Sequence, residues 1–195
     1  EKFPGMNIKQ LVEKTRTIRR FDEKYEIGVD QLTELIDLAR LSASAANRQP
    51  LKYMIITRPD ERARIFPFLS WAGYLTTWEG PAPGERPSAY IVLLGDKEIS
   101  DKFGIDPGIA AQSIMLGATE AGIGGCIFAS IKREALRKEF SISDQYEILH
   151  VLALGKPVEQ VIIETIKEND VKYWRDSQAI HHVPKRTLEE IIIHK

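Results

Sequence analysis

The sequence predicts one domain that mixes helices with strands, and three observations support this fold class. The chain has 195 residues, which is within the range of one large domain. Hydrophobic residues make up 43% of it, enough to bury a core. Short apolar runs typical of buried strands lie between segments whose apolar residues recur at helical spacing. Spacing alone leaves a parallel α/β sheet and an α+β arrangement equally open.

The first half of the chain predicts three helices and two strands. Helices are expected at residues 7–15, 30–41 and 59–66. Strands are expected at residues 53–57 and 89–94. Asp30 is the expected N-cap of the second helix, and Pro59 begins the third. Residues 42–50 interrupt the helical pattern, residues 70–87 form a loop rich in glycine and proline, and Gly95 closes the second strand.

The second half continues the pattern of helices and strands up to residue 157. Helices are expected at residues 107–121 and 132–140, and strands at 126–129 and 148–154. Asp106 is the expected N-cap of the helix at 107–121, which is apolar around most of its circumference and should be central. The tail from Val158 is charged and irregular. No internal repeat or low-complexity linker is present, so residues 1–195 are expected to form a single domain.

Composition and charge exclude several functions. The chain has 27 Lys and Arg residues against 28 Asp and Glu residues, which argues against binding nucleic acid. No apolar run approaches the ~20 residues that a membrane-spanning helix needs, and no signal-peptide pattern is present. Cys126 is the single cysteine, so no intrachain disulfide can form. We therefore expect a cytoplasmic protein that does not enter membranes, with Cys126 as a buried structural thiol.

The run from Arg16 to Phe21 holds three guanidinium groups and a hydroxyl. Arginine presents a planar fork of donors that matches a phosphate group. A local basic cluster on a nearly neutral chain points to one small anion. A solvated helix end explains the same residues equally well, because cations are favoured at helix C-termini.

Two other segments have candidate ligand-binding residues. The segment 42–50 combines small residues with the amides of Asn47 and Gln49, which suits a flat heterocycle but also an ordinary helix end and turn. Trp71, Tyr74 and Trp78 could line an apolar pocket for a planar substrate or pack on each other within the loop.

Several other patterns favour structural roles. The glycine-rich stretch at 117–125 lacks the Lys-Ser/Thr of a P-loop and lies at a helix end, so a helix cap explains it better. The histidines show no metal-binding spacing, and His181 and His182 would point to opposite sides of a strand. No metal site is expected. Lys185 and Arg186, taken alone, are surface residues.

The order of these motifs resembles the nitroreductase family of FMN-dependent oxidoreductases. The chain contains Arg-Thr-Ile-Arg-Arg-Phe, then Ser-Ala-Ala-Asn-Arg-Gln-Pro, a small-residue helix ending in Gly-Ile-Gly-Gly, Leu-Ala-Leu-Gly-Lys-Pro and finally Pro-Lys-Arg. The resemblance runs from about residue 8 to residue 190. It implies an α+β fold with a mixed, mostly antiparallel sheet flanked by helices. It also implies an intertwined homodimer with FMN sites at the subunit interface.

The resemblance also implies roles for individual residues. Arg16, Thr17 and Arg19 should hold the FMN phosphate and ribityl chain, joined by Lys185 and Arg186, while Arg20 is not needed. Ser44, Ala45, Asn47 and Gln49 should approach the flavin from the other subunit, although Ala43 stands where the family has proline. Phe128 and Ala129 match the position beside flavin N5, with an Ala129 N–H in place of the usual glycine N–H.

The implied activity is hydride transfer from NADH or NADPH, through the flavin, to a small-molecule acceptor such as a nitroaromatic compound or a quinone. No protein general acid is required. The chain is short for the family and lacks the long helical excursion of larger members, whose place the loop from Trp71 to Pro87 would partly take. Three alternatives remain open: a flavin-binding or flavin-sequestering protein without turnover, a dehalogenase-like member of the same superfamily, and an α/β protein that binds another phosphorylated ligand through Arg16 and Arg19.

Overall fold

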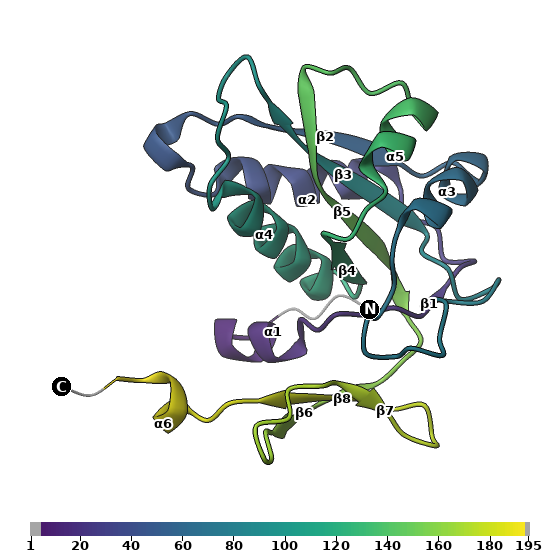
Figure 1. The fold of residues 1–195 in the computed structure, drawn as a ribbon, viewed down its shortest axis with the longest axis vertical. Coiled ribbons are helices and arrows are strands. Elements are labelled where there is room, and N and C mark those ends of the chain that lie inside the picture. Colours follow the sequence, from purple (N-terminus) through teal and green to yellow (C-terminus); the bar gives the residue numbers. More distant parts are fainter. Residues whose placement is uncertain (1–4, 194–195) are drawn as a thin grey trace.

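The structure, a computed structural model, describes residues 5–193 and is built on a five-stranded antiparallel sheet. Figure 1 shows β5 running through the centre of the molecule. One edge of β5 pairs with β3, which pairs in turn with β2, and the other edge pairs with β4 and then with β1. The strands are β1 (Phe21–Asp22), β2 (Leu51–Ile56), β3 (Ala89–Asp96), β4 (Gly124–Phe128) and β5 (Tyr146–Pro157).

Helices cover both faces of this sheet because its central strands are apolar on both sides. Alternate residues of β3 enter two different cores: Ile91 and Leu93 pack with α2 and α4, whereas Tyr90 and Val92 pack with α3 and α5. This alternation follows from the two-residue repeat of a strand. The helices of the main body are α1 (Ile8–Lys14), α2 (Val29–Leu41), α3 (Pro59–Ile65), α4 (Asp106–Glu120) and α5 (Arg133–Glu139), with short 3-10 turns at Ala45–Asn47 and Phe66–Phe68.

Helix α4 is the central helix, as the sequence predicts. Nine of its residues are buried, and it packs closely on α2 because Gly117 has no side chain: a Cβ there would lie 2.3 Å from Cδ1 of Leu38. Thr15, just after α1, donates a hydrogen bond to Thr119 near the end of α4 at 3.0 Å. Helix α1 itself buries none of its side chains, and Ile8 is 68% exposed.

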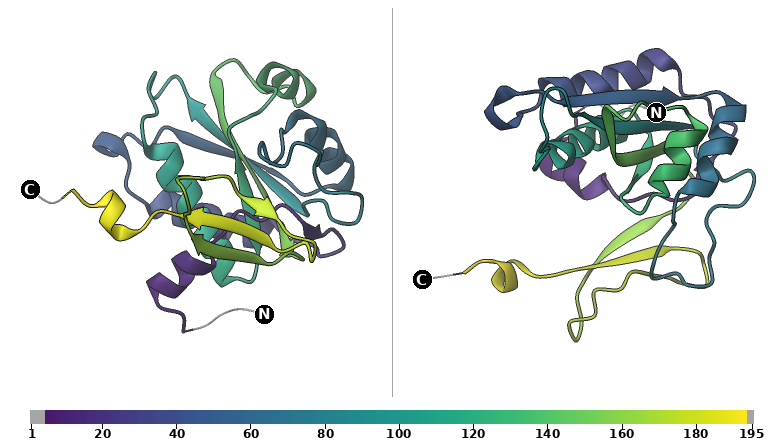
Figure 2. Two further views of the ribbon diagram at one scale, coloured as in Figure 1. Left: turned by 60° about the horizontal axis from the view of Figure 1, so that its bottom comes forward. Right: turned by 45° about the horizontal axis from the view of Figure 1, so that its top comes forward.

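The prediction of an irregular tail after Val158 is wrong. The tail forms a second sheet in which β6 (Val161–Thr165) pairs in parallel with β8 (His181–Lys185), and β7 (Trp174–Arg175) pairs antiparallel with β8. A short helix α6 (Leu188–Ile191) follows. Figure 2 shows this segment laid along one side of the main body, with its end extending away from it. These strands were missed because their pairing joins residues that are distant in sequence and their side chains are only partly apolar.

Smaller corrections concern the ends of elements. Gly28, rather than Asp30, is the N-cap of α2, and Ile105, rather than Asp106, is the N-cap of α4. Gly95 lies within β3 instead of closing it. Strand pairing is antiparallel throughout the large sheet, and the small sheet contributes the parallel pair, so the prediction of a mixed, mostly antiparallel α+β fold is confirmed.

Candidate functional site

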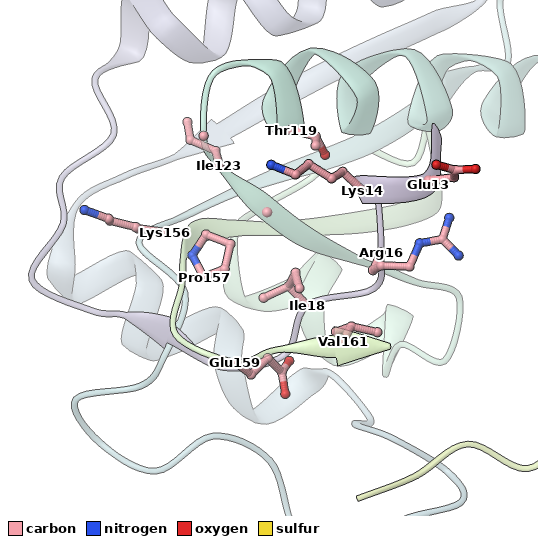
Figure 3. A pocket seen from close by; sticks show the side chains of 12 residues that line it. Glu13, Lys14, Arg16, Ile18, Thr119, Ile123, Lys156, Pro157, Glu159 and Val161 are labelled. Carbon is pink, nitrogen blue, oxygen red and sulfur yellow. The ribbon is translucent and has the colours of Figure 1, made fainter. Parts of the chain in front are cut away.

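A cavity of about 690 Å³ lies between the end of α4, the segment after α1 and the start of β6 (Figure 3). Its size is within the range of small-molecule and cofactor sites. The residues that line it are Glu13, Lys14, Arg16, Ile18, Thr119, Gly122, Ile123, Gly124, Lys156, Pro157, Glu159 and Val161. Figure 3 shows Arg16 and Lys156 on opposite sides of this space.

Glycine shapes the wall of this cavity. A Cβ at Gly124 would lie 2.7 Å from the side chains of both Ile18 and Pro157. A Cβ at Gly125 would lie 2.6 Å from the carbonyl oxygen of Ala153. The amide of Ile18 donates to the carbonyl of Gly125 at 2.8 Å, which fixes the basic segment against β4. The glycines predicted as a helix cap therefore also let two backbones approach closely.

The three arginines of the basic run have different surroundings. Arg16 faces the cavity, where its Nη2 donates to the carbonyl of Val12 at 2.8 Å. Burial lowers the pKa of Arg16, and its buried Nε has no hydrogen-bond partner in the structure. Arg20 instead forms a bidentate ion pair with Glu85, with N–O distances of 2.9 and 2.5 Å. Both ends of the Arg20 guanidinium are therefore held by a carboxylate of the same chain.

Arg19 belongs to a separate buried cluster beside the cavity. Its Nη1 lies 3.4 Å from Nε2 of His181, and its guanidinium group lies 4.8 Å from the centre of the Tyr173 ring. Glu159 accepts the backbone N–H of Arg19 at 2.5 Å and pairs with Arg175 at 3.1 Å. The Nε of Arg19 is buried without a hydrogen-bond partner. Thr17, between the two arginines, is exposed, and its backbone forms a parallel bridge with Gly125.

The amide-rich segment lies at the opposite end of α4. Ser44 donates to Asp106 at 2.6 Å, and the backbone N–H of Ala45 donates to the same carboxylate at 2.9 Å. Asn47 and Gln49 are exposed, and both have positive φ angles, at 53° and 52°. Such angles are uncommon outside glycine, so the anchoring by Asp106 stabilises a strained loop.

The length of α4 separates these two groups of predicted residues. The 15 residues of α4 span about 22 Å. Thr15, next to Arg16, is hydrogen-bonded near the C-terminal end of α4, whereas Ser44 is bonded to its first residue. Within one chain the structure therefore does not bring Arg16 and Ser44 together.

The other predicted site residues are spread over the surface and the second core. Phe128 is 3% exposed at the end of β4, and Ala129 is exposed directly after it. Lys185 lies at the end of β8, four residues and about 13 Å along the strand from His181. Arg186 is hydrogen-bonded to Asn169 and Glu190.

The aromatic loop packs on its own chain. The Trp71 ring contacts Phe128 at 4.7 Å and Trp78 at 6.2 Å between ring centres. Tyr74 contacts Tyr173 at 4.9 Å, and Arg175 lies 4.7 Å above the Trp78 ring. Of the two interpretations left open by the sequence, packing within the chain agrees better with these contacts.

Sequence reasoning missed four residues that hold these segments in place. Asp106 contacts the loop after α2, and the other three lie around Arg19: Glu159, Arg175 and His181. Asp106 was expected to cap a helix, but the residue is 3% exposed and its carboxylate holds the loop after α2. Glu159, Arg175 and His181 lie in the tail that the sequence leaves irregular. No local signal marks them, because their contacts depend on the tail folding back on the main body.

The fold and the arrangement of this region can be compared with known proteins. The model of the family described as "Nitroreductase family" matches residues 12–73 and 82–156, more than half of the chain. This chain belongs to the nitroreductase family. The resemblance inferred from the motifs is therefore confirmed.

Individual members of the nitroreductase family are distant relatives. The protein named "Putative NAD(P)H nitroreductase YodC" from Bacillus subtilis is 22% identical over 182 residues, covering 78% of this chain and 90% of that protein. A solved structure titled "putative nitroreductase in complex with FMN" from Exiguobacterium sibiricum has a TM-score of 0.69 at 19% identity, covering 90% of this chain and all of that one. A nitroreductase family protein from Clostridium difficile has a TM-score of 0.64 at 23% identity, covering 78% and 86%.

The two solved structures share the fold of this chain over 90% and 78% of its length. Across residues 5–193 the structure contains no helix that is both long and apolar enough to cross a membrane.

Cys126 is buried, as predicted, and burial raises the pKa of its thiol to about 11. His181 and His182 take opposite sides of β8, also as predicted: His181 contacts Arg19, and His182 contacts Glu164. His194 lies outside the described residues.

Proposed function

We propose that this protein is an FMN-dependent NAD(P)H oxidoreductase that reduces nitroaromatic compounds, quinones or related acceptors. The observation that supports this proposal best is that the three arginines of the basic run differ in their hydrogen-bond partners. Arg20 is paired with Glu85, whereas Arg16 and Arg19 each keep a buried Nε without an acceptor. Buried donors without partners are costly, so an anion bound at this segment is favoured. The FMN bound by the Exiguobacterium family member agrees with a flavin phosphate as that anion.

The residues present fit FMN in charge, and the cavity beside Arg16 has a volume typical of cofactor sites. The guanidinium groups of Arg16 and Arg19 and the hydroxyl of Thr17 are of the types suited to a phosphate and a ribityl chain. Lys185 and Arg186 would add positive charge from the tail. Phe128 and Ala129, at the end of β4, would lie beside the ring system, where the N–H of Ala129 is the expected donor to N5.

The second group of residues would come from another copy of the chain. Ser44, Ala45, Asn47 and Gln49 lie about one helix length from Arg16, so one flavin can contact both groups only at a subunit interface. Exposed apolar residues support a homodimer, because α1 leaves Ile8 exposed and the tail leaves Leu188 65% and Ile193 90% exposed. We therefore propose that residues 1–195 act as one FMN-binding domain that is complete only as a homodimer. Light scattering of the purified protein tests this, and a monomer that binds FMN with full affinity would contradict it.

When bound, FMN supplies the capacity to accept hydride from a nicotinamide and to donate it to an acceptor. The chain's own residues would bind the cofactor and orient it. Arg16 and Arg19 would neutralise phosphate charge, and the anchored loop at Ser44 would hold amide groups in a fixed direction. Burial keeps the Cys126 thiol protonated, so it does not act as a competing nucleophile. Because the nicotinamide and the acceptor would occupy the same place in turn, we expect ping-pong kinetics.

The direct test is the colour and chemistry of the purified protein. It should be yellow, release FMN on denaturation, and be bleached anaerobically by NADH or NADPH. A quinone or nitroaromatic acceptor should then restore the colour. Bound FMN that neither nicotinamide bleaches would favour a flavin-binding protein without turnover. A colourless protein that cannot be reconstituted with FMN would refute the proposal.

A further inference from the structure

His182 lies between two carboxylates of the C-terminal sheet. Its Nδ1 lies 2.6 Å from Oε1 of Glu164, and its Nε2 lies 3.2 Å from Oδ2 of Asp176. Glu164 belongs to β6, Asp176 directly follows β7, and His182 belongs to β8, so these contacts join all three strands of the sheet. The side chain of His182 is 11% exposed, against 37% for Glu164 and 24% for Asp176. The imidazole is therefore enclosed, while both carboxylates reach the surface.

Trp174 covers one face of the same imidazole. The ring centres of Trp174 and His182 are 4.0 Å apart, and the rings are nearly parallel, at 5°. A cation above an indole ring is favoured, so this stacking favours a protonated His182. Strand β7 is two residues long and pairs with β8 at Trp174 and Arg175. Because so short a strand has few backbone hydrogen bonds, side-chain contacts contribute much of its attachment.

Only the doubly protonated imidazole satisfies both carboxylate contacts. A neutral histidine has one N–H group and one acceptor nitrogen, and an ionised carboxylate only accepts. In the neutral form, one ring nitrogen and one carboxylate oxygen would therefore present lone pairs to each other. Although burial opposes it, the hydrogen bonds to Asp176 and Glu164 raise the pKa of His182 above its ordinary value. Both contacts are therefore complete at acidic pH, and one is lost as the pH rises through that higher pKa.

The other charged groups near His182 titrate in a different range. Glu164 and Asp176 are the carboxylates that pair with it within residues 5–193. Asp176 also accepts two backbone N–H groups of the following turn, and although burial opposes them, these hydrogen bonds and His182 lower its pKa. His181, the next residue on β8, has its pKa lowered to about 4 by burial first and then by two nearby arginines. A change of this sheet above neutral pH therefore reports His182.

The strand held by His182 also contacts the aromatic loop at residues 71–78. The backbone N–H of Tyr74 donates to the hydroxyl of Tyr173 at 3.3 Å, and the two rings lie 4.9 Å apart. The guanidinium group of Arg175 lies 4.7 Å above the Trp78 ring. Figure 2 shows this loop extending from the main body to the C-terminal sheet. Two residues at β7 therefore connect the sheet to the loop.

We propose that His182, Glu164 and Asp176 form a pH-dependent clasp, which is closed when both nitrogens of His182 carry a proton. The closed clasp holds β7 against β8 and, through Tyr173 and Arg175, holds the aromatic loop on the sheet. Raising the pH removes one proton from His182 and loosens β7 and the loop together. The main sheet has no part in this change, because the clasp contacts β6, β7 and β8 alone among the described elements.

Hydrogen exchange of the purified protein, followed by mass spectrometry of its peptides, measures this opening. Wild type and His182→Gln are compared at the same pH, so that the intrinsic exchange rate cancels. At about pH 5.5, residues 161–185 should exchange roughly tenfold more slowly in the wild type, as expected for lost charge-assisted hydrogen bonds. At about pH 9 the difference should fall below about twofold, and the aromatic loop should respond in the same sense.

Two outcomes of this comparison would overturn the proposal. A tenfold difference that persists at high pH would show that His182 contributes packing alone. An aromatic loop that exchanges alike in both proteins at acidic pH would show that the loop is not held through β7.

Asp176→Asn separates the charge of the clasp from its shape. Asparagine keeps an oxygen for the turn and offers an amide N–H to Nε2 of neutral His182, whose Nδ1–H still donates to Glu164. This variant should therefore keep its protection at about pH 9, where the wild type loses it. Asp170→Asn is the matched control, since Asp170 is exposed and accepts the backbone N–H of Lys172, and it should keep the wild-type pH dependence. Thermal unfolding confirms that each variant is folded. If Asp176→Asn opens at high pH as the wild type does, the clasp is refuted.

Discussion

Ser44 Oγ donates a 2.6 Å hydrogen bond to Oδ2 of Asp106, which lies 62 residues further along the chain. The other oxygen of the same carboxylate accepts the backbone N–H of Ala45 at 2.9 Å. Asp106 occupies the first turn of α4, where the helix dipole also favours a negative charge. One buried carboxylate therefore fixes the start of α4 to the loop that holds the predicted amide donors.

Replacing this carboxylate should lower stability. We expect Asp106→Ala to reduce the free energy of unfolding by about 1.5–3 kcal/mol, because charge-assisted hydrogen bonds are lost and Ser44 is left without its acceptor. Urea denaturation measures this change. Asp30→Ala is the control, since Asp30 is exposed in the first turn of α2 and should cost no more than about 1 kcal/mol. Equal costs at the two positions would contradict the anchoring role.

Substitutions of Arg19 and of Arg20 should differ in their effects on FMN binding. Arg19→Gln should weaken FMN binding by about 1.5–3 kcal/mol, because it removes a charge-assisted contact with the phosphate. Arg20→Gln should leave FMN affinity nearly unchanged and reduce stability by about 1 kcal/mol through loss of its pair with Glu85. Equilibrium dialysis and urea denaturation measure the two effects. If both substitutions lowered the FMN affinity equally, the proposed difference between a cofactor-binding Arg19 and a structural Arg20 would be wrong.

Close backbone packing at β4 should make Gly125 intolerant of a side chain. A Cβ at this position would lie 2.6 Å from a backbone oxygen of β5, which cannot move without disturbing the strand. We expect Gly125→Ala to destabilise the protein by about 1–3 kcal/mol in thermal or chemical unfolding. Gly108→Ala in α4 meets no atom within 4 Å and should stabilise by about 0.5–1 kcal/mol. A neutral result at Gly125 would contradict the packing at this strand.

Stability should depend on pH through His181. Its pKa is about 4 in the folded protein, through burial first and then through Arg19 and Arg175, against 6.5 as the ordinary value. A histidine with a lowered folded pKa contributes stability above its unfolded pKa and loses it as the pH falls toward 4. His181→Phe should therefore show a smaller loss of stability between pH 6.5 and pH 4 than the wild-type protein. Parallel slopes for the two proteins would exclude this contribution.

His182 should behave in the opposite sense. Although burial opposes it, hydrogen bonds to Asp176 and Glu164 raise the pKa of His182 above its ordinary value. Its contribution is then complete at low pH and is lost as the pH rises through that higher pKa. His182→Gln should flatten the decline of stability above about pH 6.5. A variant whose alkaline limb still matches the wild type would rule out this role.

Most of the main body could be predicted from sequence because its signals are local. Apolar periodicity identified α1, α2 and α4, and apolar runs identified β2, β3 and β5 to within a few residues. The family motifs, in their order, led to the α+β fold and to the basic run as a binding segment. End positions were less accurate: Gly28 and Ile105 are the N-caps where Asp30 and Asp106 were expected.

The sequence by itself therefore determined the family and the layered α+β core, since hydrophobic spacing and motif order are properties of the chain. Only the tertiary structure decided which partner each arginine contacts. Arg20 is paired because Glu85 arrives from a distant loop, and Arg19 is joined by His181 because the tail folds back. A side chain's role depends on the partners that folding brings to it, and those partners lie 65 and 162 residues away.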